Sequence, residues 1–295
     1  MGSVFKPVLA AAALEQGILP EYECTGAVVV DGQIFRCAGG VPHGTVDMTA
    51  ALEKSCNGYF IRLGQQLGAE TLLQMSRQLG FGQEVPVAGA LHADAGKLPS
   101  AGELAQSGQL ANFSFGQGGL LASPVQIAAM MNTIASGGVY RTPFFVCGSV
   151  DETDGTPLET LAHPQSRRVM GAENAAFLRK MLQQVVEEGT AQDAAWLEEG
   201  AGGKTGTAQT GQFTPDARNA KTCGSQGLPG AAAALHHCGA AGRAGEHGTF
   251  QRCHLCPAVR NAGPSGIKMH GFCLLFCACY ATIYLYFCVV FVELK

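Results

Sequence analysis

The chain opens with Gly2-Ser3-Val4-Phe5-Lys6-Pro7, and the apolar, Ala-rich run 8–14 follows directly. Proline suits the first turn of a helix, because its missing N–H has no helical partner there. Gly17 is well placed to end such a helix. The stretch therefore predicts a buried helix that carries Ser3 and Lys6 at its start. Residues at i and i+3 share a helix face, so Lys6 can reach Ser3.

Ser3 and Lys6 are the residue types of a nucleophile and its base. A serine hydroxyl is a weak nucleophile and needs a base beside it. A lysine serves as that base only when it loses its proton near neutral pH, which burial and a second cation both favour. Lys204 is a candidate for the second cation. The alternative is an ordinary helix start with a solvated lysine in its first turn.

A second motif, the S-x-N of Ser55-Cys56-Asn57, lies within a helix that Asp47 is expected to cap and that should run to about residue 63. Ser55 could relay a proton to a leaving amine, and Asn57 could hold a substrate amide. The alternative is a local polar interruption of a helix, with both side chains bonded to backbone. Cys56 is interpreted as a packed side chain.

A third motif, K-T-G-T, follows two glycines as Lys204-Thr205-Gly206-Thr207. Lys204, Thr205 and Thr207 suit a substrate carboxylate, and Gly206 would let a substrate backbone approach as an added strand. The backbone N–H groups of Ser3 and Thr207 are the expected oxyanion donors. The alternative is a glycine-rich loop with an isolated lysine.

S-x-x-K, S-D-N and K-T-G are the set used by penicillin-binding proteins and class A β-lactamases. With these motifs, residues 1–213 resemble the transpeptidase domain of a class B penicillin-binding protein of the elongation or division type. Further segments carry the same resemblance: 51–60, 115–118, 123–126, 185–191 and 203–209.

The resemblance implies an α+β penicillin-binding/β-lactamase-like fold, in which a helical subdomain accompanies an antiparallel sheet, here incomplete. It implies that Ser3 is acylated by a D-Ala-D-Ala stem peptide of peptidoglycan, or by a β-lactam, and that an amine from a neighbouring stem resolves the acyl-enzyme in cell-wall cross-linking. No metal and no cofactor is expected. A glycan-polymerising cell-wall protein is an expected partner, at the extracytoplasmic face of the bacterial cell membrane.

Two other functions stay open. One is hydrolysis by a D,D-carboxypeptidase or β-lactamase of the same superfamily. The other is a catalytically inactive remnant. In the family, strands precede the S-x-x-K helix and follow the K-T-G strand, and this sequence shows neither set. A lone K-T-G strand would leave unpaired backbone at an uncovered edge.

Charge divides the chain in two. Residues 1–219 hold 13 basic and 21 acidic side chains, whereas 220–295 hold 6 and 2. Eight of the twelve cysteines also lie in the second part. We therefore expect a partial transpeptidase domain over 1–213 and an unrelated tail over 214–295.

The net charge of −4 gives no reason to expect nucleic acid as a partner. The first residues do not have the pattern of a signal peptide.

The tail offers two hypotheses. Residues 271–292 are uncharged and long enough to span a bilayer, so they could associate with a membrane. Cys253-His254-Leu255-Cys256, with His236, His237 and Cys238, could form a zinc site, although a single C-x-x-C is a weak signal.

Local patterns predict the remaining elements. Residues 27–30 and 33–36 flank Asp31-Gly32 as in a hairpin, across which Cys24 and Cys37 could form a disulfide. Helices are expected over 69–79, from Ser123-Pro124 to about 136, and over 172–188, and an extended loop over 84–110.

Overall fold

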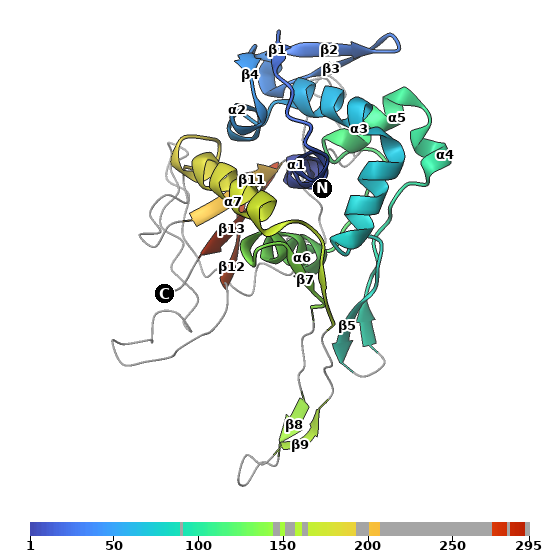
Figure 1. Ribbon diagram of the computed structural model, residues 1–295, viewed down its shortest axis with the longest axis vertical. Coiled ribbons are helices and arrows are strands. Elements are labelled where there is room, and N and C mark those ends of the chain that lie inside the picture. Colours follow the sequence, from blue (N-terminus) through green and yellow to red (C-terminus); the bar gives the residue numbers. More distant parts are fainter. Residues whose placement is uncertain are drawn as a thin grey trace.

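The computed structural model describes residues 1–88, 91–143, 148–150, 157–160, 165–192, 201–206, 273–281 and 284–292. Its helices are η1 (Gly2–Phe5), α1 (Lys6–Gln16), η2 (Ala38–Gly40), α2 (Met48–Glu53), α3 (Asn57–Gln78), α4 (Ala101–Leu104), α5 (Ser107–Ser114), α6 (Pro124–Ala135) and α7 (Ala172–Glu187). Figure 1 shows them around α1.

Helix α1 is the centre of the core, as the opening sequence predicts. Every residue from Lys6 to Leu14 is buried, and α3 and α7 both pack against the helix. Four consecutive alanines leave room for these close neighbours. Gly17 ends the helix in the left-handed conformation that residues with a Cβ avoid. The fold is thus built around the helix that carries the S-x-x-K motif.

The single helix expected between Asp47 and residue 63 is wrong. The chain forms α2, breaks at Lys54–Cys56, and then forms α3, which continues through a kink at Gly68 to Gln78. Ser55 has a φ of 51°, which an α-helix cannot contain. The S-x-N motif therefore lies in a sharp connection between two helices, and the helix expected over 69–79 is the second half of α3.

The extended loop expected over 84–110 is also wrong. It contains β5 (Val85–Ala88), β6 (Leu91–Ala93), α4 and the start of α5. The missed signal was Ser100 with Glu103. Their side chains each bond the other's backbone N–H in a capping box that starts α4. By contrast, α6 and α7 lie where the sequence placed them, and Ser123 caps α6 through a second capping box.

The K-T-G segment forms β11 (Ala201–Gly206), which pairs antiparallel with β13 (Tyr284–Val292), and β13 pairs with β12 (Cys273–Ala281). The strand order is β11-β13-β12. Helix α7 packs on β11 and α6 on β13. The expectation of an unpaired K-T-G strand is therefore wrong, since the tail supplies its neighbour.

Two strands cover most of the apolar segment 271–292, in place of one membrane-spanning helix. Among the described residues, no helix combines the length and the apolar character needed to cross a membrane. The cysteines and histidines of the hypothetical zinc site at 236–256 lie outside the described residues.

A small β-region covers one end of α3. The strands β1 (Tyr22–Cys24) and β4 (Gly44–Val46) pair with each other, and β2 (Ala27–Val30) pairs with β3 (Gln33–Arg36). Asp31 and Gly32 both have positive φ, as the predicted two-residue turn requires. The Cys24–Cys37 disulfide that the hairpin would have allowed is absent: the two Sγ atoms lie 3.7 Å apart, and both thiols are free.

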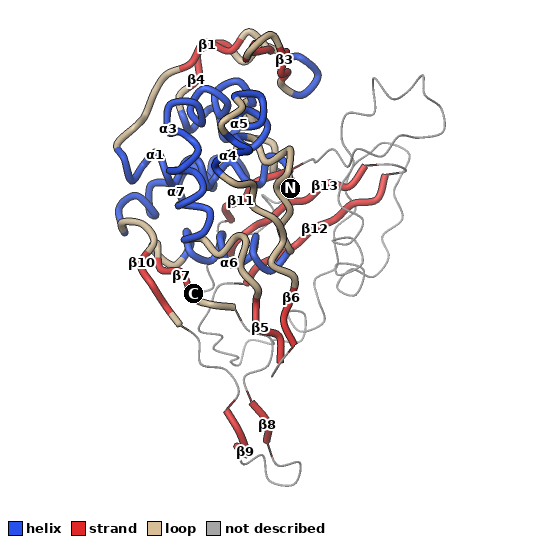
Figure 2. The backbone as a smooth tube through the Cα atoms, turned by 90° about the vertical axis from the view of Figure 1, so that its right-hand side faces the viewer, coloured by secondary structure: helices blue, strands red, loops and turns tan. Residues whose placement is uncertain are grey.

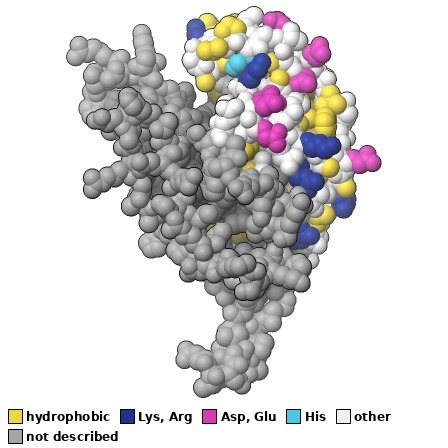
Figure 3. All heavy atoms as spheres, turned by 90° about the vertical axis from the view of Figure 1, so that its left-hand side faces the viewer, with side chains coloured by type: hydrophobic (Ala, Val, Ile, Leu, Met, Phe, Trp, Pro, Cys, Tyr) yellow, Lys and Arg dark blue, Asp and Glu magenta, His cyan; other side chains and the backbone are white. Residues whose placement is uncertain are grey.

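The remaining strands lie at the opposite end. They are β7 (Val139–Arg141), β8 (Gly148–Val150), β9 (Pro157–Thr160) and β10 (Ser166–Arg168). Figure 2 shows β8 and β9 as a hairpin that projects from the body. On the face drawn in Figure 3, acidic and basic side chains are interspersed with apolar ones over the described surface.

Asp47 gives a test of the observed start of α2. Its carboxylate accepts a hydrogen bond from the N–H of Ala50 at 2.8 Å and so starts α2. We expect Asp47→Ala to lower the free energy of unfolding by about 1 kcal/mol, because one helix donor loses its partner. Asp47→Asn keeps an acceptor oxygen and should stay close to the unaltered chain in chemical denaturation. Equal destabilisation by both substitutions would contradict this assignment.

Candidate active site

The S-x-x-K motif lies at a junction of two helices. Ser3 is in the 3-10 turn η1 and is partly buried, and Lys6 is the first residue of α1. The side chain of Lys6 is completely buried. Its Nζ donates hydrogen bonds to the carbonyl oxygen of Ser55 (2.7 Å), the hydroxyl of Ser55 (3.1 Å) and Oδ1 of Asn57 (2.8 Å). None of these three bonds goes to Ser3.

The conformation of Ser55 makes this arrangement possible. Its positive φ turns the chain sharply between α2 and α3, and both its carbonyl and its hydroxyl oxygen face Lys6. Asn57 is held from its other side, because its Nδ2 donates to the carbonyl of Arg36 at 2.8 Å. A strained backbone angle at a polar cluster is a common mark of a functional site. The S-x-N motif thus presents three oxygen atoms to one lysine.

Strand β11 brings the third motif to the same place. The Nζ of Lys204 donates to the Ser55 hydroxyl at 3.0 Å, and its side chain is completely buried. The Thr205 hydroxyl lies 2.6 Å from the hydroxyl of Thr190, which follows α7. Thr207 lies outside the described residues. One serine hydroxyl therefore accepts hydrogen bonds from two buried lysines 198 positions apart in sequence.

Burial and charge act in the same direction on Lys6. Its acceptors are all uncharged oxygens, so no carboxylate among its bonded partners compensates an ammonium charge. Desolvation holds the pKa of Lys6 well below that of an exposed lysine, and the positive charge of Lys204 lowers it further. Lys6 therefore loses its proton more readily than an exposed lysine, as a general base requires.

Two glycines let other segments approach the turn η1, which carries Ser3, closely. Gly116 has a positive φ, and a Cβ there would collide with the carbonyl oxygen of Gly2. In the same contact, the N–H of Gly2 donates to the carbonyl of Gly116 at 2.7 Å. At Gly206, a Cβ would collide with the side chain of Val4. Gly206 thus allows β11 to lie against η1, a requirement separate from the expected approach of a substrate backbone.

The structure brings together Lys6, Ser55, Asn57 and Lys204 through hydrogen bonds, and β11 adds Thr205 and Gly206. Thr190 is a further residue of the site that the motifs did not predict, and its N–H also donates to the carbonyl of Glu53 at 3.1 Å. Thr190 therefore joins the end of α2 to β11. Its position within the segment 185–191, which carries the family resemblance, was the available signal. The arrangement has the parts needed for acyl transfer: a partly exposed serine, a buried amine and a second hydroxyl between two lysines.

Comparison with known proteins identifies the family of the chain. Residues 1–224 match the family described as the penicillin binding protein transpeptidase domain. The chain is 31% identical over 212 residues to stage V sporulation protein D of Bacillus subtilis, which covers 70% of this chain and 32% of that protein. It is 36% identical over 221 residues to the penicillin-binding protein PbpB of Mycolicibacterium smegmatis, with 70% and 33% covered. The chain thus spans about a third of the length of these relatives.

Solved structures show the same fold. Penicillin-binding protein 3 of Mycobacterium tuberculosis in complex with aztreonam aligns with a TM-score of 0.62 and 30% identity, over 73% of this chain and 49% of that one. The ceftriaxone acyl-enzyme of penicillin-binding protein A from the same organism aligns with a TM-score of 0.63 and 27% identity, over 74% and 48%. As its motifs predicted, the chain belongs to the penicillin-binding protein transpeptidase family, has its α+β fold and is related to the class B members.

Proposed function

We propose that this chain is an acyl-transfer domain that cross-links peptidoglycan stem peptides, with Ser3 as nucleophile and Lys6 as general base. The observation that carries the proposal is the buried amine of Lys6, one helical turn from Ser3 and bonded only to neutral oxygens. The acyl-enzyme of a structural relative supports the same chemistry, since that protein is acylated by a β-lactam.

The proposed reaction begins with a proton transfer. Neutral Lys6 takes the proton of the Ser3 hydroxyl while the Ser3 oxygen bonds to the carbonyl carbon of the penultimate D-alanine. The C–N bond to the terminal D-alanine then breaks, and the leaving amine receives a proton through the Ser55 hydroxyl. An amine from a second stem peptide attacks the Ser3 ester, gives up its proton by the reverse route and releases Ser3. Atoms and protons balance over the two steps.

The substrate side of the proposal rests on β11. Within the described residues β11 is an edge strand, with β13 on one side only, so a peptide could add to its other edge by backbone pairing. Lys204 and Thr205, with Thr207, would bind the terminal carboxylate, and Asn57 a substrate amide. The N–H groups of Ser3 and Thr207 would stabilise the oxyanion. Pairing with β13 means that β11 is not the lone strand from which an inactive remnant was argued.

Covalent capture of penicillin tests this proposal. We expect intact-mass analysis after incubation with benzylpenicillin to show one penicilloyl adduct, which Ser3→Ala abolishes. Lys6→Ala should slow its formation by at least about 10²-fold, because the hydroxyl loses its base. Ser107→Ala, which changes a serine at the start of α5, is the matched control and should label normally. An adduct that persists in Ser3→Ala would disprove the assigned nucleophile, and no adduct in a folded sample would mark an inactive remnant.

The pH dependence of acylation tests the role of Lys6. Only the neutral amine can accept the Ser3 proton, so the acylation rate should rise with pH through the lowered pKa of Lys6 and level off above it. The rate can be followed as adduct formation between about pH 5 and pH 9, the range around the working pH of a general base.

Lys204→Met sharpens this measurement. Because the charge of Lys204 lowers the pKa of Lys6, its removal should move the rise in rate to higher pH. A substitution that only weakened binding of the carboxylate would reduce the rate without moving the profile. A profile that stays in place, or a rate that falls as the pH rises, would contradict Lys6 as the base.

A further inference from the structure

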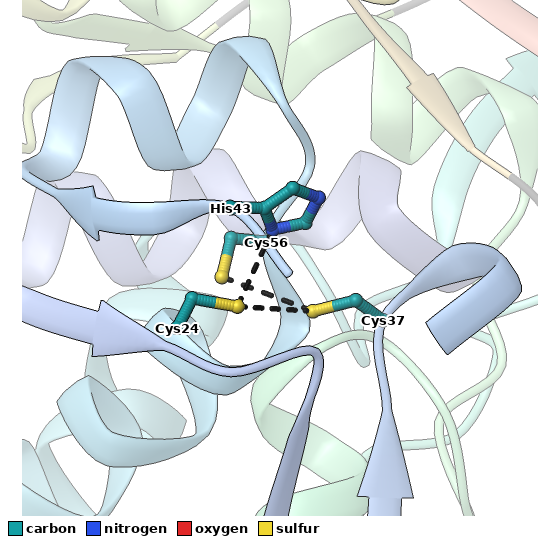
Figure 4. Close-up of side chains that lie close together, drawn as sticks. All are labelled: Cys24, Cys37, His43 and Cys56. Atoms are coloured by element: carbon teal, nitrogen blue, oxygen red, sulfur yellow. Dashed lines mark hydrogen bonds between the residues drawn. The ribbon is translucent and has the colours of Figure 1, made fainter. Parts of the chain in front are cut away.

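Four potential metal ligands meet behind the S-x-N motif. They are Cys24 at the end of β1, Cys37 just after β3, His43 just before β4, and Cys56 at the start of α3. Their ligand atoms all lie within 4.8 Å of one another. Figure 4 shows the three sulfur atoms and the imidazole nitrogen directed toward one point from four separate segments.

Three of the six separations between the ligand atoms are close to the edges of a tetrahedron around a zinc ion, and all six lie within 4.8 Å. With zinc–sulfur bonds of about 2.3 Å and zinc–nitrogen bonds of about 2.05 Å, two sulfurs should lie about 3.8 Å apart, and a sulfur and a nitrogen about 3.6 Å apart. The Cys24–Cys37 and Cys37–Cys56 sulfur pairs lie at 3.7 and 3.9 Å. Nδ1 of His43 lies 3.4 Å from the Cys24 sulfur. The separations already found therefore leave room for a central ion.

Backbone pairing holds the ligands in this position. Cys24 lies opposite Gly44 in the β1–β4 ladder, and the N–H of His43 donates to the carbonyl of Cys24 at 3.1 Å. The N–H of Cys37 donates to the carbonyl of Gly26 at 3.0 Å and closes the β2–β3 hairpin between the first two cysteines. The three cysteine side chains are nearly inaccessible, at 0–3% exposure. The ligand set is thus preorganised, with the three sulfur ligands shielded from solvent and His43 partly buried.

The chemistry of the donors selects the ion. Three thiolates and one neutral imidazole in tetrahedral positions form a closed structural site of the type that binds Zn²⁺. An ordinary apolar core could hold three thiols, but it would not place an imidazole nitrogen against them. A disulfide would use only two of the three sulfurs and leave the third cysteine and His43 without a role.

We propose that Cys24, Cys37, His43 and Cys56 bind one Zn²⁺ ion and that this ion fixes the conformation of the S-x-N motif. This departs from the expectation of no metal, and it does not depend on the proposed transpeptidase activity. Each cysteine thiol loses its proton as its sulfur binds the ion. Cys56 lies between Ser55 and Asn57, so an ion bound to it holds the residue on either side.

The structural consequence concerns the strained turn. Ser55 has a positive φ, and its oxygens accept from both Lys6 and Lys204. A residue in the left-handed region costs roughly 1–3 kcal/mol, so its neighbours must hold it in place. A coordination bond at Cys56 would supply this restraint. It would also connect the β-region that covers α3 to the catalytic hydroxyls.

Metal analysis of the purified chain is the first test. The chain is prepared without metal under reducing conditions, and ZnCl₂ or CoCl₂ is then added. We expect one tightly bound ion for this cluster, a tetrahedral thiolate–cobalt absorption spectrum, and X-ray absorption at the zinc edge that fits three sulfurs and one nitrogen. These measurements use the unaltered chain and do not require that any variant fold. No thiolate–cobalt band, or a disulfide between two of these cysteines in chain prepared with zinc, would overturn the proposal.

Substitutions then locate the ion. Cys24→Ser and His43→Ala should each remove the cobalt band or weaken zinc binding by more than the 10- to 100-fold typical of second-shell changes. Cys147→Ser is the matched control, and the double variant Cys253→Ser/Cys256→Ser tests the tail. Both should keep the band. A band lost only in the tail variant would assign the ion to the tail and overturn this site.

Hydrogen exchange tests the effect on the motif. Zinc should slow amide exchange in peptides that contain Ser55 to Asn57 and leave peptides from α6 unchanged. This readout is independent of acylation, so it distinguishes a failure of the metal site from a failure of the proposed enzyme. Equal exchange with and without bound zinc would show that the ion does not restrain the motif.

Discussion

A buried amine without a bonded carboxylate partner is the constraint on which this site depends. Lys6 is completely inaccessible, and it bonds only to uncharged oxygens of Ser55 and Asn57. A charged ammonium in such surroundings is expensive, and Lys204 beside it increases the cost. Burial and the second cation therefore both favour the uncharged form of this amine. The long alanine-rich helix α1 makes this possible, since it carries Lys6 directly into the core.

Close approach of backbone segments gives the site its shape. The turn η1, which carries Ser3, lies between the Gly116 turn on one side and the end of β11 on the other, and glycine is required at both contacts. Thr190 adds a connection from α2 to Thr205 through its backbone and its hydroxyl. These contacts hold the S-x-x-K and K-T-G segments in one geometry, although about two hundred residues separate them. Preorganisation of this kind lets fixed dipoles and donors act without rearrangement during a reaction.

The S-x-N motif connects two parts of the molecule. Toward the core, Ser55 and Asn57 accept hydrogen bonds from Lys6, and toward the β-region Cys56 contacts Cys37. The motif therefore supplies Ser55 and Asn57 to the cluster around the two lysines and Cys56 to the thiol–imidazole cluster. Cys56 follows Ser55 directly in the chain, so a restraint on Cys56 also limits the movement of Ser55. The Ser55 hydroxyl accepts hydrogen bonds from both lysines, and the β-region can therefore influence the candidate active site through Cys56.

Local sequence patterns were sufficient to identify the family, the α1 helix, the β2–β3 hairpin, α6, α7 and the three motifs. These depend on a proline and a glycine at helix ends, an Asp-Gly turn, a capping box and short spacings within each motif. The break at Ser55, the pairing of β11 with the tail, and the meeting of three cysteines with His43 became evident in three dimensions alone. Each of these depends on segments far apart in sequence, and local propensity contains no information about which distant partner will satisfy a strand edge, a strained turn or a buried thiol.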